Sequence, residues 1–434
     1  MLPSSLKKKF QSDAGILMEL QYGHRTIDLR LPNGLSYEVL QAVGEEPLAD
    51  PEKSLLEALR SPIASPPLKE VVRAGETVCL LVNDSTRLAR SEFFLPLLID
   101  ELAQAGISKD AIFIIFANGT HRPLDPAEMN NLVGERVAKK ITMFNHDSRK
   151  YEELSCLGET SYKTPVYINN KVLHADRRIL TGSVVHHYFA GYGGGRKALV
   201  PGVAGWETIK QNHSLMFDER ACSGRLDGNP VHEDLLEAAL MVGGDFLLNT
   251  VLDENKNILG FFAGNMIKAH LAACHMADRV YGVEIDRLAD VVIASCGGYP
   301  KDINLYQVHK TLDHAMKAVK KGGDVILLAK CSEGIGSDAY KDWINKCMPL
   351  PEMEEMLRSE FALGGHKAYT VGKLLQQGRV HLVSDLDPEE ARLFGFIPAS
   401  SLEAAVAEIY QKRKDLLTYI ILQGSIVLPR YKKR

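Results

Sequence analysis

The chain has 434 residues, of which 45% are hydrophobic and 24% are charged, and its formal net charge is −4. A chain of this length and composition can bury a large core and is expected to form two domains, or three. The nearly balanced charge gives no reason to expect nucleic acid or an anionic membrane as a partner.

The N-terminus and the cysteines favour the same compartment. The opening "MLPSSLKKKFQSDAGILMEL" has basic residues but no long apolar run after them, so no signal peptide is predicted. No segment approaches about 18 consecutive apolar residues, so no membrane span is expected. The seven cysteines are scattered without a C-x-x-C pair, which favours reduced thiols in a cytoplasmic protein.

Strand-like and helix-like segments alternate in the first part of the chain. Strands are predicted at 76–84, 111–119 and 177–185, and helices at 91–106 and 206–216. Such alternation predicts an α/β architecture with a mostly parallel sheet.

A second α/β region follows, and the boundary between the two is placed near 280–288. This predicts an N-terminal domain of residues 1–284 and a C-terminal domain of residues 285–424. The polar tail 425–434 could return to the first domain. The strands predicted in the second region are 289–298, 324–330, 379–386 and 417–424, and its helices are 305–323, 351–364 and 401–413.

Polar residues follow the ends of four predicted strands, which is where ligands bind in open α/β sheets. They are Asp84, Ser85, Thr86 and Arg87, then His121, then the stretch "HHYFAGYGGGRKALVPGVAG" from His186 to Gly205, and then Gln307 and Lys310. Taken singly, each has an ordinary structural explanation, such as a surface ion pair for Arg87 or a turn cap for Asp84. Their joint location after successive strands predicts a pocket at one edge of the sheets.

The stretch from His186 to Gly205 holds two adjacent histidines, six glycines and a lysine that follows an arginine. It is not a Walker A loop, because Ala198 follows Lys197 where a hydroxyl is required, and it lacks the spacing of the dinucleotide fingerprint. Glycines still let backbone N–H groups approach an anion, so a phosphate-bearing cofactor stays open beside a tight interdomain turn. His186 and His187 are expected to point to opposite sides of a strand.

Several motifs together resemble the nickel-dependent lactate racemase family. They are "DSTR", "NGTHRP", the stretch from His186 to Gly205, "NH" at 212–213, "YQVHK" at 306–310 and "GGHKAY" at 364–369. The resemblance implies a nickel pincer nucleotide, a pyridinium-3,5-bisthiocarboxylic acid mononucleotide carrying nickel. It also implies that Lys197 is the covalent attachment point, through a thioamide, and that His213 is the protein ligand of the metal.

The same resemblance implies roles for the other polar residues. His121 and His187 would form the acid/base pair, and the four residues of "DSTR" would line the cofactor. Arg87 would bind the substrate carboxylate, and two residues of the second domain would reach the substrate in a cleft between the domains, namely Gln307 and Lys310. The family pattern would have Pro at the position of His186 and Ser at that of Gly193, so which of the adjacent histidines acts stays open.

These residue types suit the implied chemistry. Imidazole transfers protons near neutral pH and also binds nickel, and Arg grips a carboxylate at two points. The expected function is a racemase or epimerase of lactate or a related 2-hydroxy acid, by reversible hydride transfer to the cofactor, which other proteins synthesise and load. The alternatives are a non-catalytic protein that binds the nickel cofactor or a phospholigand, and a nucleotide-dependent dehydrogenase.

Overall fold

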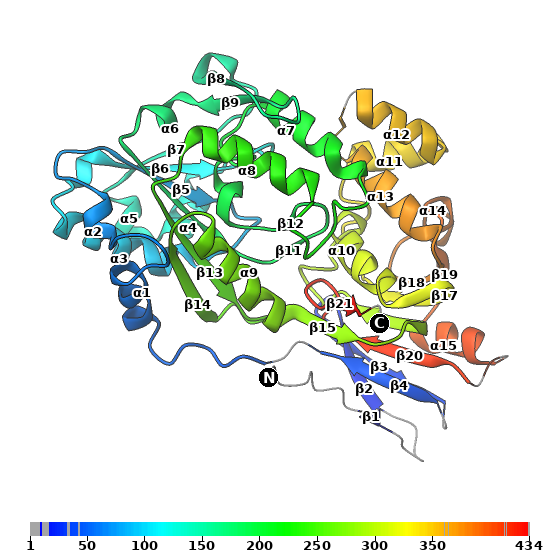
Figure 1. The fold of residues 1–434 in the computed structure, drawn as a ribbon. Helices are drawn as coiled ribbons and strands as arrows, with labels where there is room; N and C mark the ends of the chain where they lie inside the picture. The colour runs from blue at the N-terminus through cyan, green and yellow to red at the C-terminus, as the bar shows by residue number, and fades with distance from the viewer. Residues whose placement is uncertain are drawn as a thin grey trace. The chain divides into compact units, whose positions relative to one another are not determined.

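The computed structural model describes residues 9–10, 17–32, 35–41, 44–359, 361–362, 364–411, 413 and 415–432. The chain forms two compact units (Figure 1). Unit 2 is Gly44–Val280, and unit 1 contains the described parts of Met1–Val43 and of Tyr281–Arg434. The N-terminal segment is therefore grouped with the C-terminal part of the chain, whereas the sequence placed residues 1–284 in one domain.

Unit 2 is built on a sheet that has six strands among its described residues, in the order β14-β13-β10-β5-β6-β7. All neighbouring strands are parallel except β13 and β14. The strands are β5 Val78–Asn83, β6 Ile112–Ala117, β7 Thr142–Asn145, β10 Arg177–Ser183, β13 Phe246–Leu252 and β14 Ile258–Gly264. The predicted α/β class with mostly parallel strands is confirmed.

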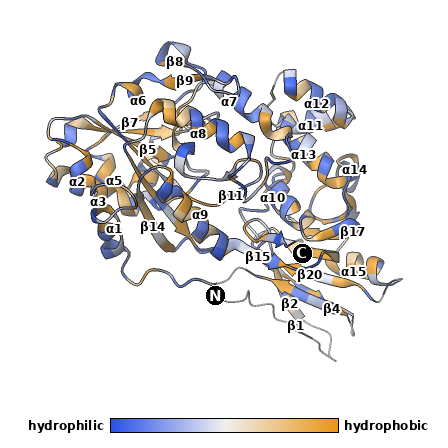
Figure 2. Cartoon of the chain, in the orientation of Figure 1, coloured by the Kyte–Doolittle hydropathy of each residue, from blue (hydrophilic) through white to orange (hydrophobic). Residues whose placement is uncertain are grey.

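Apolar side chains project from both faces of this sheet, so each face must be covered by other parts of the unit. Along β5, Val78, Leu80 and Val82 belong to one core, and Cys79 and Leu81 belong to another. In Figure 2 the strands are mainly coloured as hydrophobic, and the helices carry hydrophilic stretches. The helices of unit 2 are α1 Pro51–Arg60, α2 Leu68–Val71, α3 Ser91–Gln104, α4 Pro126–Val133, α5 Glu135–Ala138, α6 Asn170–His174, α7 Trp206–Ser214, α8 Pro230–Val242 and α9 Lys268–Tyr281, whose last residue falls in unit 1.

Unit 1 contains a sheet with seven strands among its described residues, in the order β1-β4-β20-β16-β17-β18-β19. Only the β1–β4 pair of this sheet is antiparallel. The strands are β1 Lys9–Phe10, β4 Ser36–Leu40, β16 Ala289–Ser295, β17 Val319–Leu328, β18 Arg379–Val383, β19 Ile397–Ala399 and β20 Leu417–Ile421. The pairing of β4 with β20 explains why the N-terminal segment belongs to this unit.

Smaller elements complete the two units. In unit 1 they are the hairpin β2 Leu17–Tyr22 and β3 Arg25–Arg30, and the helices α10 Leu305–Met316, α11 Asp338–Asn345, α12 Leu350–Ser359, α13 Gly365–Leu375, α14 Pro388–Leu393 and α15 Leu402–Tyr410. Unit 2 has the hairpin β8 Leu154–Glu159 and β9 Pro165–Asn169. The polar tail forms β21 Leu428–Tyr431, which pairs with β15 Gly282–Ile285 inside unit 1. None of the described helices combines the length and the apolar character needed to cross a membrane.

One helix boundary differs from the sequence prediction. The helix expected over 305–323 ends at Met316, and β17 already begins at Val319. Gly322 has a φ of +76°, and the ladder between β16 and β17 shifts register near this point. The two adjacent glycines therefore belong to an irregularity inside a strand, where a left-handed residue is accommodated, and they do not end the helix.

Candidate functional site

Two turns at the carboxyl edge of the unit 2 sheet bring Asp84 and His121 together. β5 and β6 are parallel neighbours, so the residues that follow them emerge side by side. The Nδ1 atom of His121 forms a short hydrogen bond with Oδ2 of Asp84. The other carboxylate oxygen accepts hydrogen bonds from the backbone N–H and the hydroxyl of Thr86, at 3.2 and 2.8 Å.

These contacts keep Asp84 ionised. Its carboxylate is buried, and burial by itself raises a carboxyl pKa. The hydrogen bonds from His121 and Thr86 and the charge of Arg87 outweigh burial, so the pKa of Asp84 lies below its usual value. An ionised carboxylate at Nδ1 retains the proton of a neutral imidazole there, which leaves Nε2 of His121 as the proton acceptor.

Ser85, Thr86 and Arg87 are exposed in the turn after β5. The turn is closed by a hydrogen bond from the backbone N–H of Arg87 to the carbonyl of Asp84, at 3.1 Å. The Arg87 guanidinium donates from Nη1 to the carbonyl of Thr86 at 3.1 Å. Because a guanidinium has five N–H donors, this local bond leaves donors for a carboxylate ligand.

The two adjacent histidines lie in a short hairpin formed by β11 (His186–His187) and β12 (Gly191–Tyr192). Their side chains have different surroundings. That of His186 is only 2% exposed, and its Nε2 lies 2.9 Å from Oδ1 of Asp278. His187 is half-buried, and its Nδ1 accepts a hydrogen bond of 3.3 Å from the backbone N–H of Ala190.

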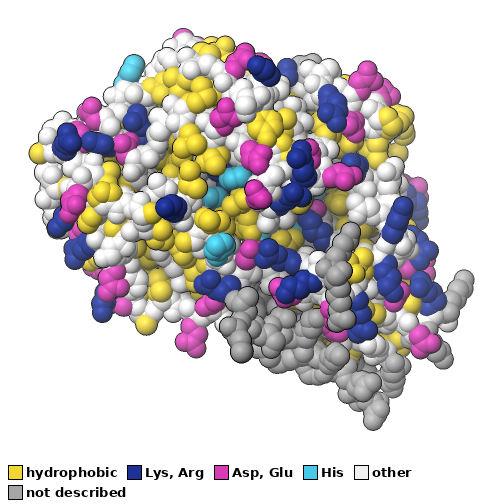
Figure 3. All heavy atoms as spheres, viewed as in Figure 1, with side chains coloured by type: hydrophobic (Ala, Val, Ile, Leu, Met, Phe, Trp, Pro, Cys, Tyr) yellow, Lys and Arg dark blue, Asp and Glu magenta, His cyan; other side chains and the backbone are white. Residues whose placement is uncertain are grey.

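Three of the predicted site residues surround the ring of Phe189. The ring centroid lies 4.7 Å from the imidazole of His187 and 5.0 Å from that of His213 on α7. The Nζ atom of Lys197 lies 5.9 Å from the same centroid. The hairpin, the glycine-rich segment and α7 thus present their polar groups around one buried apolar side chain. On the face drawn in Figure 3, histidine side chains reach the surface among apolar ones in the part of unit 2 that carries α8 and α9.

Lys197 lies in the 3-10 helix η3 (Gly195–Ala198), in surroundings that favour the neutral form of its amine. Burial is the main cause, and the charges of Arg196 and Arg87 add to it, so the pKa of Lys197 lies well below its usual value. Within the described part of the chain, Nζ forms no hydrogen bond or ion pair. A neutral amine is the nucleophilic form of lysine.

The glycines let their segment pack directly on buried side chains. A Cβ on Gly194 would lie 2.8 Å from Oδ1 of Asn249, and one on Gly195 would lie 2.5 Å from Cγ of His270. Both glycines have positive φ, +71° and +58°. The same two side chains hold the segment, because Asn249 accepts a hydrogen bond from the N–H of Gly195, and Nε2 of His270 donates to the carbonyl of Gly193, each at 2.9 Å.

Arg196 anchors the same segment from within the core. It is 1% exposed, and its Nη2 donates to the carbonyl of Ala190 at 2.7 Å. Burial lowers the pKa of this guanidinium to about 10. Arg196, His270 and Asn249 were not predicted as site residues from the sequence. Asn249 could have been found as a buried polar residue, because it interrupts the apolar run "FLLNTVL". Nothing in the local sequence indicates that three site residues lie around Phe189.

Gln307 and Lys310 lie nearly one turn apart on α10, in unit 1. The Nζ atom of Lys310 donates to Oε1 of Gln307 at 2.9 Å. Between them in the sequence, His309 is buried, and its Nε2 accepts a hydrogen bond of 2.6 Å from Lys367 of the "GGHKAY" motif. The structure thus joins these two motifs within unit 1, and the action of Gln307 and Lys310 on a substrate stays a prediction.

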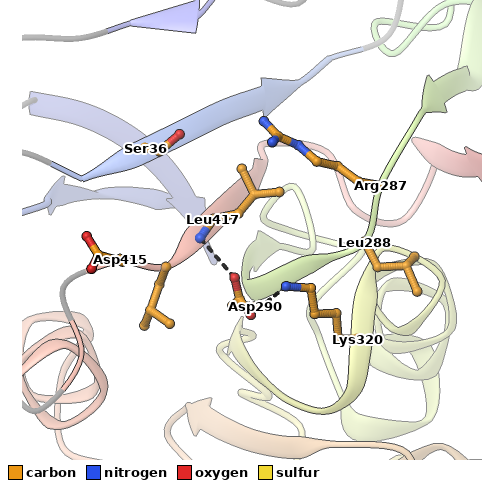
Figure 4. A pocket seen from close by; sticks show the side chains of 8 residues that line it. Ser36, Arg287, Leu288, Asp290, Lys320, Asp415 and Leu417 are labelled. Carbon is orange, nitrogen blue, oxygen red and sulfur yellow. Dashed lines mark hydrogen bonds and ion pairs between the residues drawn. The ribbon is translucent and has the colours of Figure 1, made fainter.

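A depression of about 420 Å³ in unit 1 contains none of the predicted site residues. It lies at the amino ends of parallel strands, where Ser36 begins β4 and Leu417 begins β20, opposite to the edge where ligands normally bind. Asp290 is engaged there by the N–H of Leu417 at 3.1 Å and by Lys320 at 2.8 Å (Figure 4). The carboxylate of Asp290 is therefore already engaged by groups that line the depression.

Comparisons with known families agree along most of the chain. The model of the lactate racemase N-terminal domain matches residues 22–224, and that of the lactate racemase C-terminal domain matches residues 285–428. A lactate racemase of Thermoanaerobacterium thermosaccharolyticum is 31% identical over 376 residues, covering 85% of this chain and 88% of the relative. One of Lactiplantibacillus plantarum is 30% identical over 414 residues, covering 92% and 95%.

Solved structures show the same fold. The lactate racemase apoprotein from T. thermosaccharolyticum superposes with a TM-score of 0.86 at 30% identity, covering 96% of this chain and 100% of that one. A protein from Thermotoga maritima superposes with a TM-score of 0.67 at 18% identity, covering 90% and 99%. The second likeness concerns the fold alone.

Gly195→Ala is expected to lower the free energy of unfolding of unit 2, because the new methyl would overlap His270 in a backbone of positive φ. The expected loss is about 2–4 kcal/mol, measured by urea unfolding. Gly243→Ala is the control, since Gly243 has a φ of +79° but no atom within 4 Å of a built Cβ. Equal losses in both variants would contradict the packing argument.

The amine of Lys197 is expected to react with acetic anhydride at lower pH than the exposed lysines, since only the neutral form reacts and its pKa is lowered. Removing a nearby positive charge raises that pKa, so Arg87→Gln should move the pH midpoint for Lys197 upward. Arg90→Gln, which removes a charge that does not act on Lys197, is the control. Competitive labelling of the cofactor-free protein with peptide mass spectrometry measures each midpoint, and a common midpoint for all lysines would refute the prediction.

Proposed function

This chain belongs to the lactate racemase family, a family of isomerases, and we propose that it racemises or epimerises a 2-hydroxy acid, lactate or a related one. The observation that carries the proposal is the grouping of His187, Lys197 and His213 around Phe189. These are the residues that the family resemblance assigns to proton transfer, cofactor attachment and metal binding. The substrate is a small anionic hydroxy acid, and the cofactor is loaded by other proteins.

The residues present fit a covalently attached nickel pincer nucleotide. The amine of Lys197, whose pKa is lowered by burial, suits a thioamide link, and the imidazole of His213 suits nickel. No three His, Cys, Asp or Glu side chains among the described residues are grouped to hold an ion, and the resemblance assigns the other donors to the cofactor itself. When bound, this group supplies a metal centre and a hydride-accepting ring carbon. The protein orients the substrate against it.

The two acid/base histidines are prepared for opposite tasks. The carboxylate of Asp84 keeps a proton on Nδ1 of His121, so Nε2 accepts the hydroxyl proton of one enantiomer. The N–H of Ala190 donates to Nδ1 of His187, which favours the tautomer with the proton on Nε2. The neutral ring of His121 can therefore accept a proton at Nε2, and the neutral ring of His187 can donate a hydrogen bond from Nε2 to the carbinol oxygen; His187 delivers a proton to that oxygen only from its protonated form.

Arg87 holds the substrate carboxylate in this proposal. It follows Asp84 by three residues in one turn, so the carboxylate of the substrate is held beside the base His121. A planar guanidinium grips a carboxylate at two points and so fixes its orientation as well as its charge. Gln307 and Lys310 provide the amide and ammonium that contact the substrate from α10.

Protein made together with the cofactor-synthesis enzymes should carry a mass adduct that Lys197→Ala lacks. Its nickel content should fall in His213→Ala and stay at the wild-type level in His121→Ala, because only His213 is proposed to bind the metal. Intact-mass spectrometry and metal analysis measure both quantities. An adduct of unchanged size in Lys197→Ala, or equal nickel loss in both histidine variants, would show that the roles are wrongly assigned.

The loaded protein should interconvert the enantiomers of a hydroxy acid and retain the hydrogen on its α-carbon. Starting from one enantiomer with deuterium at that carbon, in ordinary water, the product should keep its label, because a hydride does not exchange with solvent as a proton on histidine does. Circular dichroism follows inversion and NMR follows the label. Loss of label at early conversion would replace hydride transfer by proton abstraction, and failure to invert any hydroxy acid would favour a non-catalytic binding protein.

A further inference from the structure

The hairpin that carries His187 is too short to hold its own shape. Each strand has two residues, and the pairs are His186 with Tyr192 and His187 with Gly191. Two-stranded hairpins are at best marginally stable in water even when they are longer. Contacts outside the hairpin must therefore fix the direction in which His187 points.

A single carboxylate on α9 bridges the two strands. Oδ1 of Asp278 accepts a hydrogen bond from Nε2 of His186 at 2.9 Å and one from the hydroxyl of Tyr192 at 2.7 Å. His186 and Tyr192 are cross-strand partners, and their ring centroids lie 5.2 Å apart. We refer to Asp278, His186 and Tyr192 as the hairpin anchor.

The surroundings of the hairpin anchor strengthen it. The side chain of His186 is 2% exposed and that of Asp278 is 19% exposed. Hydrogen bonds to an ionised group are stronger than neutral ones, and they are stronger still where water is largely excluded. The hydroxyl of Tyr192 also lies 3.1 Å from the carbonyl of Gly224, but it has a single proton, and the shorter contact of 2.7 Å directs that proton to Asp278.

Anchoring His186 determines where His187 faces. Successive side chains of a strand point to opposite faces, so a His186 that is held toward α9 directs His187 away from that helix. On that other face His187 packs against Phe189, whose ring also contacts His213. Without the anchor, His187 would keep its chemistry but lose its fixed direction.

We propose that Asp278 and His186 are positioning residues for His187, and that His186 does not act as a second acid/base group. The proposal rests on the proposed function in one respect, namely that His187 is an acid/base group.

The experiment compares His186→Leu, which removes the donor, with His186→Gln, which keeps a side-chain N–H near the position of Nε2. Asp278→Ala removes the acceptor, and His275→Leu changes an exposed residue of the same helix as a matched control. Hydrogen exchange of the amides of residues 185–193 is measured in the cofactor-free protein by mass spectrometry. Turnover and nickel content are measured in the loaded protein.

Exchange in the hairpin should become about tenfold faster in His186→Leu and Asp278→Ala, and should stay at the wild-type rate in His186→Gln and His275→Leu. In the loaded protein, kcat should fall by about tenfold or more in the first two variants, with KM and nickel content unchanged, because a misdirected base affects the reaction rather than binding. If Asp278→Ala does not fold, the two His186 variants decide the question.

If the hairpin amides of His186→Leu exchanged at the rate seen in the wild-type protein, the proposal that the anchor holds the hairpin would be overturned. Faster exchange with unchanged kcat would overturn its positioning role, and an inactive His186→Gln with a protected hairpin would make His186 itself an acid/base group. Failure of the wild-type protein to invert any hydroxy acid would overturn the proposed function instead. In that case the exchange rates still decide whether the anchor exists.

Discussion

The close packing of the glycine-rich segment on β13 and α9 is the constraint on which the candidate site depends. Asn249 and His270 occupy the space that side chains at positions 194 and 195 would need, and the same two residues bind the backbone of the segment. Phe189 and Lys197 lie on either side of these glycines in the sequence. Because the backbone between them is held by buried side chains, their relative placement is fixed by the core of unit 2.

This packing also sets the electrostatics of the site. Arg196 is drawn into the core by its hydrogen bond to the carbonyl of Ala190, and its charge then lies next to the amine of Lys197. A buried cation is costly unless it is hydrogen-bonded, and it disfavours a second cation nearby. The same buried arginine therefore stabilises the segment and contributes to the lowered pKa of Lys197.

The sequence predicted the parts of this structure that depend on local pattern. The apolar runs at β5, β6 and β10 identify buried parallel strands, and the polar residues after them include the pair Asp84 and His121, which the structure brings into contact. Features that depend on distant residues were not predictable. β4 pairs with β20 across most of the chain, and Asp278 lies 92 residues from His186. Gly322 and Gly323 in β17 were wrongly predicted to end a helix, because glycines mark both the end of a helix and an irregularity within a strand.

Within the described parts of the chain, His121, His186 and His381 each contact an aspartate, and the exposure of the side chains differs among these pairs. In the pair of His381 with Asp324, both side chains are at most 4% exposed, and that of His186 in the pair with Asp278 is 2% exposed, so neither imidazole can present a free nitrogen to a ligand from solvent. The side chain of His121 is 44% exposed, while its partner Asp84 is 5% exposed. Only this pair combines a buried carboxylate, which fixes the tautomer, with an imidazole that a substrate can approach. The same two residue types therefore form a structural contact where the histidine is enclosed, at His186 and His381, and leave an accessible imidazole at His121, the residue that is proposed as a general base.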